Sequence, residues 1–180
     1  MAEFNDMQQL KRHFFAMRNG ALAEQMRRQG APYSIIFGLN LPQLAEISRE
    51  IEPSADFAER LWANDSTRES LLLAPMIYPK GEMTLPVSLR WATSCPTAEV
   101  ADILCHRLLR HLSFANEIVD ALADAERNLD RYLSLRLRLN LFPSRLDEAK
   151  AAAEAELSRD CPLTRNLSRQ ILDEIEFLSE

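Results

Sequence analysis

Apolar residues recur at spacings of three and four along almost the whole chain, the pattern of helices with one buried face. Glycine is rare, with 4 among 180 residues, and glycine inside a helix costs about 1 kcal/mol relative to alanine. Residues that commonly cap helix N-termini open the apolar stretches at a regular interval. These residues form two interleaved series, Ser54, Thr84, Ser113 and Ser144, and Ser66, Thr97, Asn128 and Asp160. In both series the interval between successive residues is about 31 positions, which predicts a helix pair repeated about four times.

The predicted pairs are 54–64 with 66–78, 84–94 with 97–111, 114–125 with 128–142, and 144–158 with 161–178. Helix pairs of this kind bury their inner faces only by stacking on their neighbours. The predicted fold is therefore all-α, a HEAT-like helical-repeat superhelix with an N-terminal helical cap. The whole chain, 1–180, is expected to form one domain, with the cap at 1–52 and the pairs at 53–180. A plain helical bundle is the alternative.

The cap is predicted to contain helices at 5–18 and 20–29, followed by a third from Pro42 to Ile51. Asn19-Gly20 has the composition of a helix-ending pair. The loop at 35–41 is unusually apolar, so we expect it to lie beneath the neighbouring helices.

Several positions in the repeated region are predicted from their place in a helix. Leu72, Leu104 and Leu137 lie centrally on the second helices of their pairs, so we expect them to be buried between helical layers. Ser66 and Glu69 have the spacing of a capping box.

Two stretches resemble the DNA alkylation repair family. Residues 37–47, FGLNLPQLAEI, resemble the family segment F-G-V-x-x-P-x-L-R-x-I-A, and they include Phe37, Gly38 and Pro42. Leu61-Trp62 followed by Arg68-Glu69 and Leu73-Ala74 resembles the next family stretch. The resemblance implies a stack of HEAT-like repeats. It also implies excision of N3- or N7-alkylated purines from DNA bound on a cationic concave face. For Arg68 and Glu69 we expect pairing between repeats.

The resemblance also indicates a site on the helix that starts at Thr97. Asp102 matches the family's catalytic aspartate, but Ala98 stands where the family has a tryptophan. Leu135 aligns with the family's arginine, and Arg136 is expected to face elsewhere. The chain also ends before the repeat that supplies a further aromatic residue in longer members. The alternative interpretation is that Asp102 is a solvated acid near a helix N-terminus, where acids suit the helix dipole.

The net charge of the chain is −6, which opposes general affinity for nucleic acid. Only residues 85–145 are net positive, with 8 Lys and Arg against 7 Asp and Glu. Candidates for contact with DNA phosphates in this region are Arg107, Arg110, Arg136 and Arg138. The alternative is that these arginines form salt bridges with nearby acids.

No cofactor or metal is predicted, because the three cysteines form no paired motif and are expected to be buried thiols. The N-terminus lacks the pattern of a signal peptide and no apolar run is long enough to span a membrane, so we expect a cytoplasmic protein. Three functions remain open. The first is a scaffold that binds DNA or a partner without efficient base excision. The second is an active alkylpurine DNA glycosylase that uses Asp102. The third is a protein–protein adaptor.

Overall fold

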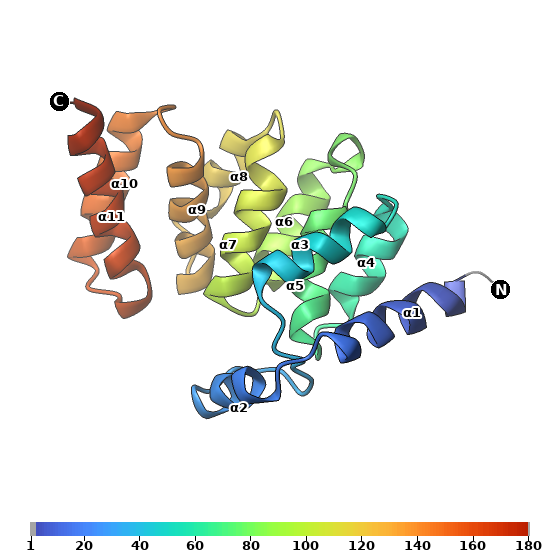
Figure 1. The fold of residues 1–180 in the computed structure, drawn as a ribbon. Coiled ribbons are helices and arrows are strands. Elements are labelled where there is room, and N and C mark those ends of the chain that lie inside the picture. Colours follow the sequence, from blue (N-terminus) through green and yellow to red (C-terminus); the bar gives the residue numbers. More distant parts are fainter. Residues whose placement is uncertain (1–2, 180) are drawn as a thin grey trace. The chain divides into compact units, whose positions relative to one another are not determined.

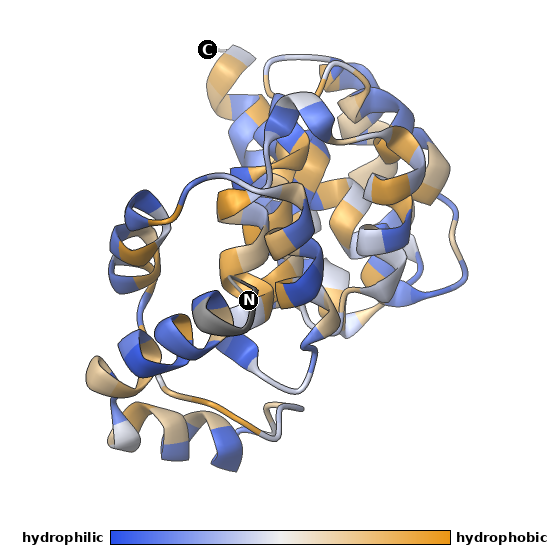
Figure 2. Ribbon diagram, turned by 90° about the vertical axis from the view of Figure 1, so that its right-hand side faces the viewer, coloured by the Kyte–Doolittle hydropathy of each residue, from blue (hydrophilic) through white to orange (hydrophobic). Residues whose placement is uncertain are grey.

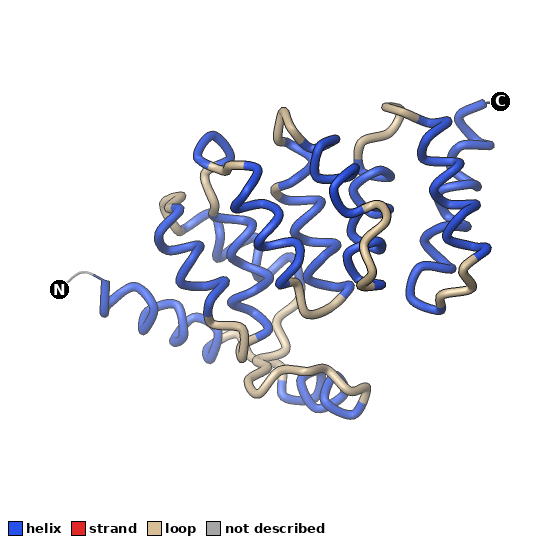
Figure 3. The backbone as a smooth tube through the Cα atoms, turned by 180° about the vertical axis from the view of Figure 1, so that it is seen from behind, coloured by secondary structure: helices blue, strands red, loops and turns tan. Residues whose placement is uncertain are grey.

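The structure, a computed structural model, describes residues 3–179, and these residues form helices joined by loops (Figure 1; Figure 3). Within this range the β-pairing is limited to an isolated bridge between Ile35 and Thr67. The predicted all-α class is confirmed. Contacts divide the chain into two compact units, the first ending at Pro79 and the second starting at Lys80.

The first unit contains the N-terminal helices and the first predicted pair. Its helices are α1 (Glu3–Ala16), α2 (Gly20–Arg28), α3 (Leu41–Glu50), α4 (Ala55–Ala63) and α5 (Arg68–Ile77). Both α3 and α4 pack against α5. This contact joins the predicted cap to the first helix pair.

The second unit contains the other three predicted pairs. Its helices are α6 (Leu85–Ser94), α7 (Ala98–Arg107), α8 (Ala115–Leu122), α9 (Asn128–Asn140), α10 (Leu146–Ser158) and α11 (Pro162–Ser179). Short 3₁₀ turns, η1 (Lys80–Glu82) and η2 (Leu109–His111), precede α6 and follow α7. The second helices of the pairs contact one another in sequence, α7 with α9 and α9 with α11, while α6 contacts α8. The unit therefore has the layered arrangement of stacked helix pairs.

Three of the predicted capping residues act as predicted. The side chains of Ser54, Thr84 and Thr97 each accept a hydrogen bond from the backbone N–H three residues later. Such caps satisfy one of the four N–H groups that lack a partner inside the helix.

The other predicted caps are wrong. The residues that precede α5, α8, α9 and α10 are Thr67, Phe114, Arg127 and Arg145, and none makes a side-chain capping bond. Asp160 lies two residues before the start of α11 rather than at its cap. The helix that begins at 97 is also shorter than predicted, because Leu108 leaves the helical conformation with φ −125° and ψ −65°.

Asn19 begins a helix instead of ending one. Its side-chain oxygen accepts from the backbone N–H of Leu22 at 3.1 Å, which makes it the N-cap of α2. The predicted break between the first two helices is present, but Asn19-Gly20 does not end the first helix, because α1 already ends at Ala16.

The predicted core positions are confirmed. Leu72, Leu104 and Leu137 are each 0% exposed. Apolar and polar residues alternate along the helices, as expected when each helix buries one face (Figure 2). The three cysteines are free and buried, as predicted, and burial raises the pKa of Cys95 to about 12.

A buried carboxylate fixes the apolar loop before α3. Glu69, on α5, accepts hydrogen bonds from the backbone N–H groups of Phe37, Gly38 and Leu39 at 3.1, 3.0 and 3.4 Å. Arg68 donates to Glu69 and to the carbonyl oxygen of Leu39, both at 3.0 Å. The pair therefore binds this loop, and the predicted capping box of Ser66 with Glu69 is wrong.

Only glycine fits position 38 of this loop, because the backbone has a positive φ there and a side chain would meet neighbouring atoms. Its φ is +77°, and a Cβ placed on it would lie 2.3 Å from the carbonyl oxygen of Asn19. A side chain at this position would force the loop and the start of α2 apart. Phe37 adds an aromatic contact with Phe14, with the ring centroids 5.5 Å apart. Pro42 lies in the first turn of α3, where its missing N–H leaves no bond unmade.

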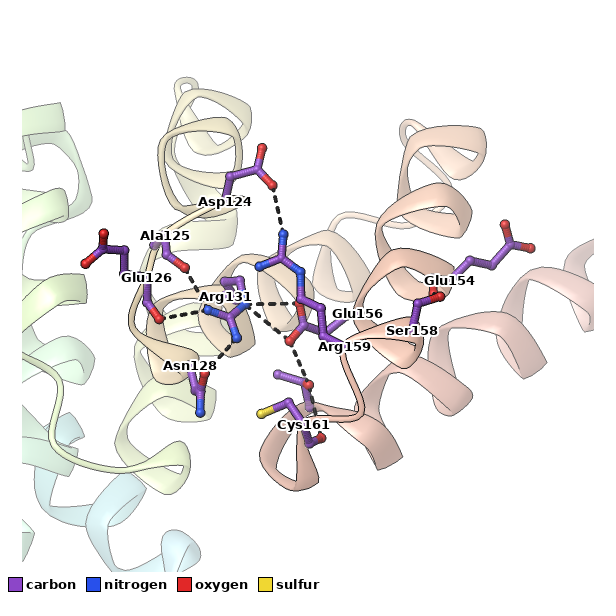
Figure 4. A network of polar contacts seen from close by, with 11 residues as sticks. Asp124, Ala125, Glu126, Asn128, Arg131, Glu154, Glu156, Ser158, Arg159 and Cys161 are labelled. Carbon is purple, nitrogen blue, oxygen red and sulfur yellow. Dashed lines mark hydrogen bonds and ion pairs between the residues drawn. The ribbon is translucent and has the colours of Figure 1, made fainter.

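A second buried network joins the last three helices (Figure 4). Arg131, on α9, donates from Nε to both oxygens of Glu156, on α10, at 3.2 and 3.1 Å. The same guanidinium donates to the carbonyl oxygens of Ala125 and Glu126. Glu156 also accepts from the hydroxyl of Thr164, on α11, at 3.0 Å. This network supports the packing of α9, α10 and α11.

Candidate nucleic-acid interface

Asp102 lies at the centre of a polar cluster between α7 and α9. Its Oδ1 accepts a hydrogen bond from the Tyr132 hydroxyl at 2.8 Å and another from Arg136 Nε at 2.7 Å. Arg136 also donates from Nη2 to the Tyr132 oxygen at 3.2 Å. We call Asp102, Tyr132 and Arg136 the carboxylate cluster.

The helix geometry explains why these residues meet. Tyr132 and Arg136 are four positions apart on α9, so they share one face. Asp102 lies on α7, which packs directly against α9. The expectation that Arg136 faces elsewhere is therefore wrong. Leu135, which the alignment placed in the site, is buried at 3% exposure. An alignment shifted by one residue rotates a helical position by about 100°, which is enough to exchange these two side chains.

The cluster is partly open to solvent. The side chain of Asp102 is 38% exposed and that of Arg136 is 21% exposed, whereas Tyr132 is buried. Burial, followed by the nearby Asp102 carboxylate, raises the pKa of Tyr132 to about 12 despite the hydrogen bond from Arg136. Burial acts to lower the pKa of Arg136, but its bonds to Tyr132 and Asp102 outweigh burial and raise it. At neutral pH the cluster thus contains a neutral phenol and a permanent cation.

Tyr132 is the residue of the cluster that sequence reasoning missed. Ala98 lies one turn before Asp102 on the same face of α7, so α7 presents no aromatic ring there. The phenol comes from the neighbouring helix instead. The sequence contains a sign of this arrangement, because Asn128, Tyr132 and Arg136 are polar residues at intervals of four and therefore share one face of α9.

A group of cationic and titratable side chains surrounds the end of α7. It consists of Lys80, His106, Arg107, Arg110 and His111, and we call it the basic cluster. Arg110 Nε donates to His111 Nε2 at 3.4 Å. Burial, and then the neighbouring arginines, lower the pKa of His106. Burial, and then Lys80 and Arg110, lower the pKa of His111.

Arg107 and Arg110 have no acidic partner within 4 Å among the described residues. The Nε of Arg107 is buried without a hydrogen-bond partner there. Arginines with forked donors suit contacts with phosphate oxygens. The structure therefore brings together two of the four predicted DNA-contacting arginines, and it leaves them without a counter-charge.

Arg138 does not belong to an exposed basic surface. It is 9% exposed, and its Nε and Nη1 have no hydrogen-bond partner among the described residues. Burial, its largest influence, lowers its pKa. The four predicted arginines thus occupy three different settings: the basic cluster, the ion pair with Asp102 and the interior.

Over residues 3–179, no three His, Cys, Asp or Glu side chains are grouped as metal ligands. The same residues contain no helix that is both long and apolar enough to cross a membrane.

The sequence model of the family described as DNA alkylation repair enzyme matches residues 10–151. The chain belongs to this family. The match covers most of the chain, and it includes the loop bound by Glu69, the carboxylate cluster and the basic cluster. No curated protein and no solved structure matches the chain. Helix α11, at Pro162–Ser179, lies beyond the matched residues of this DNA alkylation repair family member.

Proposed function

We propose that this member of the DNA alkylation repair family binds duplex DNA with its basic cluster and does not excise alkylated bases at an enzyme-like rate. The observation that carries the proposal is the state of Asp102, whose Oδ1 is already bonded to Arg136 and Tyr132. The family membership supports a role on DNA.

Electrostatics support the absence of efficient excision. When an alkylated purine leaves, positive charge grows on the deoxyribose, and a facing carboxylate would stabilise it. A unit charge 4 Å away contributes about 4 kcal/mol at an effective dielectric constant of 20. Arg136 lies 2.7 Å from the same carboxylate, so its positive charge offsets much of this field. Each 1.36 kcal/mol that is lost slows the reaction about tenfold.

The face of α7 that carries Asp102 also lacks an aromatic side chain, because position 98 is alanine. Cation–π contact with a cationic base contributes about 0.5–2 kcal/mol. Tyr132 does not replace it, because its ring is buried and its hydroxyl is engaged by Asp102 and Arg136.

One observation favours an active glycosylase as the second candidate. Oδ2 of Asp102 makes no hydrogen bond within the described part of the chain, and the side chain remains partly exposed. An approaching sugar could still reach this oxygen.

DNA binding is tested by fluorescence anisotropy on an unmodified duplex over a range of salt concentrations. Contacts with phosphates release counterions, so affinity must fall steeply with salt. Replacing Arg107 and Arg110 together by alanine should reduce the slope of log K against log salt by about 2, and equally for all sequences. The control is Arg49→Ala with Arg169→Ala, which removes the same charge from two exposed positions elsewhere. Absence of salt-dependent binding would contradict the proposal and favour the protein–protein adaptor.

Base excision is tested by release of 3-methyladenine and 7-methylguanine from alkylated duplex DNA. We expect release near the spontaneous rate, unchanged by Asp102→Asn. Arg136→Gln tests the electrostatic argument, because it removes the positive charge that offsets the field of Asp102, and release of alkylated base should rise in this variant. Release far above the spontaneous rate, abolished by Asp102→Asn, would establish the glycosylase instead.

A further inference from the structure

A small pocket lies between α9 and α10, on a different face of α9 from the carboxylate cluster. Its volume is about 280 Å³, just below the range of about 300–1,000 Å³ for drug-sized ligands. It shares no residue with the carboxylate cluster or the basic cluster. Its wall on α9 carries Arg131, Ser134, Leu135 and Arg138, which share one face of the helix at spacings of three and four.

Arg138 lines this pocket as a cation without a partner. The residue is only 9% exposed. Its Nε and Nη1 are buried without a hydrogen-bond partner, and no acidic oxygen within residues 3–179 lies closer than 4 Å to its guanidinium. A buried charge is strongly unfavourable unless an opposite charge or hydrogen bonds compensate it. An anion that entered the pocket would therefore be attracted to this guanidinium.

The other charged residues that line the pocket each have an opposite partner. These pairs are Arg131 with Glu156, Arg159 with Asp124, and Arg145, which lies outside the pocket, with Glu148. Figure 4 shows the first two of these pairs. Among the described lining residues, Arg138 is therefore the one charge that lacks a counter-ion.

A single unpaired cation selects a singly charged anion. The side chains of Asp124 and Glu148 are 93% and 52% exposed at the edge of the pocket. They would repel the second charge of a phosphate or sulfate dianion. The planar guanidinium group also matches the geometry of a carboxylate. The charges of the pocket therefore favour a monocarboxylate.

The wall on α10 supplies a small apolar surface beside the cation. Ala151, Ala152 and Ala155 line the pocket from α10, and Leu135 lines it from α9. Short methyl side chains leave space between the two helices, and their surface favours contact with a hydrocarbon group over contact with water. The pocket thus combines an unpaired cation with room for a short apolar tail.

We propose that the pocket between α9 and α10 binds a small monocarboxylate, with its carboxylate group paired to Arg138 and its hydrocarbon tail against the alanines of α10. This inference is independent of DNA binding, because no residue of the basic cluster takes part. The bound acid supplies the counter-ion that Arg138 lacks within the described chain. Because it binds the folded protein, it also stabilises the fold.

The binding test is a titration of the full chain with propionate at neutral pH and constant ionic strength, followed at the Nε–H signal of Arg138 by NMR. We expect a saturable shift with a Kd on the order of 1 mM, within the affinity ceiling for so small a ligand. Sulfate carries a second charge and should bind roughly fivefold more weakly, the scale of an exposed charge pair. Absence of saturation by propionate, equal or tighter binding of sulfate, or saturation by chloride would each overturn the inference.

Thermal denaturation of Arg138→Met is the second test. Methionine is unbranched and apolar, so the variant loses the unpaired charge and should melt no lower than the wild-type protein in chloride. Propionate at ten times its Kd should raise the Tm of the wild-type protein by roughly 5 °C and leave the variant unchanged. Arg169→Met is the matched control, because it removes the same charge from an exposed position on α11 and should keep the response to propionate.

An equal rise of Tm in Arg138→Met and in the wild-type protein would show that propionate acts elsewhere, and the inference would fail. A variant that melts well below the wild-type protein in chloride would contradict the description of Arg138 as an uncompensated charge. The NMR titration needs only the wild-type chain, so it decides on binding whatever the stability of the variant.

Discussion

Replacement of Glu69 by alanine should destabilise the first compact unit severely. The carboxylate is 0% exposed and accepts from Phe37, Gly38 and Leu39, as well as from Arg68. Its loss leaves three backbone donors short of an acceptor and leaves the charge of Arg68 without its carboxylate.

The magnitude follows from these contacts. Removing one partner of a buried ion pair costs about 3–5 kcal/mol because the other charge is left uncompensated. We expect Glu69→Ala to lose about that amount. Glu69→Gln keeps the shape and one acceptor oxygen, so its cost should be near the value of about 1.5–3 kcal/mol for a hydrogen bond to a charged group. Domains are commonly stable by only about 5–15 kcal/mol, so either loss is a large fraction.

Urea denaturation followed by tryptophan fluorescence measures the loss of unfolding free energy in the first compact unit. Trp62 lies in the first unit and Trp91 in the second. In a Trp91→Phe background the remaining signal reports the first unit, and the Glu69 variants are compared within that background. Glu46→Gln serves as the control, because Glu46 is exposed on α3. A loss below about 0.5 kcal/mol for Glu69→Ala, the usual range of surface substitutions, would refute the reasoning.

Three further predictions concern the second unit. Leu104→Ala should cost about 2–5 kcal/mol in a denaturation measurement, because Leu104 is fully buried and its removal leaves a cavity. The lowered pKa values of His106 and His111 mean that, as the pH falls through the ordinary value of 6.5, the unfolded chain takes up protons that the folded chain does not. The free energy of unfolding therefore falls on acidification. In the variant with glutamine at both positions, the free energy of unfolding should depend less on pH below neutrality. Ellman's reagent should label Cys161 before the other cysteines. Burial acts to raise the pKa of Cys161, but hydrogen bonds from Thr164 and the backbone outweigh burial and lower it. Cys161→Ser should remove the fast phase of labelling.

The helical layers could be predicted from sequence because they follow from local patterns. The apolar period of each second helix placed Leu72, Leu104 and Leu137 in the core without any tertiary information. Ser54 and Thr97 could be identified as caps because a capping bond spans only three residues.

The carboxylate cluster could not be predicted in the same way, because it depends on the rotation of α9 relative to α7. The alignment placed Leu135 in the site, whereas the side chain that pairs with Asp102 lies one position later, at Arg136. The role of Glu69 was missed for a related reason. Its partners lie about 30 residues earlier, in a loop, while its spacing from Ser66 matched a local motif. In both cases a contact between distant residues determines the geometry, and a local pattern gives no information about it.

The buried pair between Arg131 and Glu156 restricts where the last two helices can change in length. Inserting one residue into α10 between Ala149 and Glu156 would turn the carboxylate by about 100°. Arg131, with its side chain 7% exposed, would then keep its charge in the interior without a counter-ion. The adjoining loop at 141–145 lies outside the helices and can absorb an extra residue without rotating Glu156 within α10. We therefore expect insertions and deletions in this region to be tolerated in the loop and not in α10 between Ala149 and Glu156.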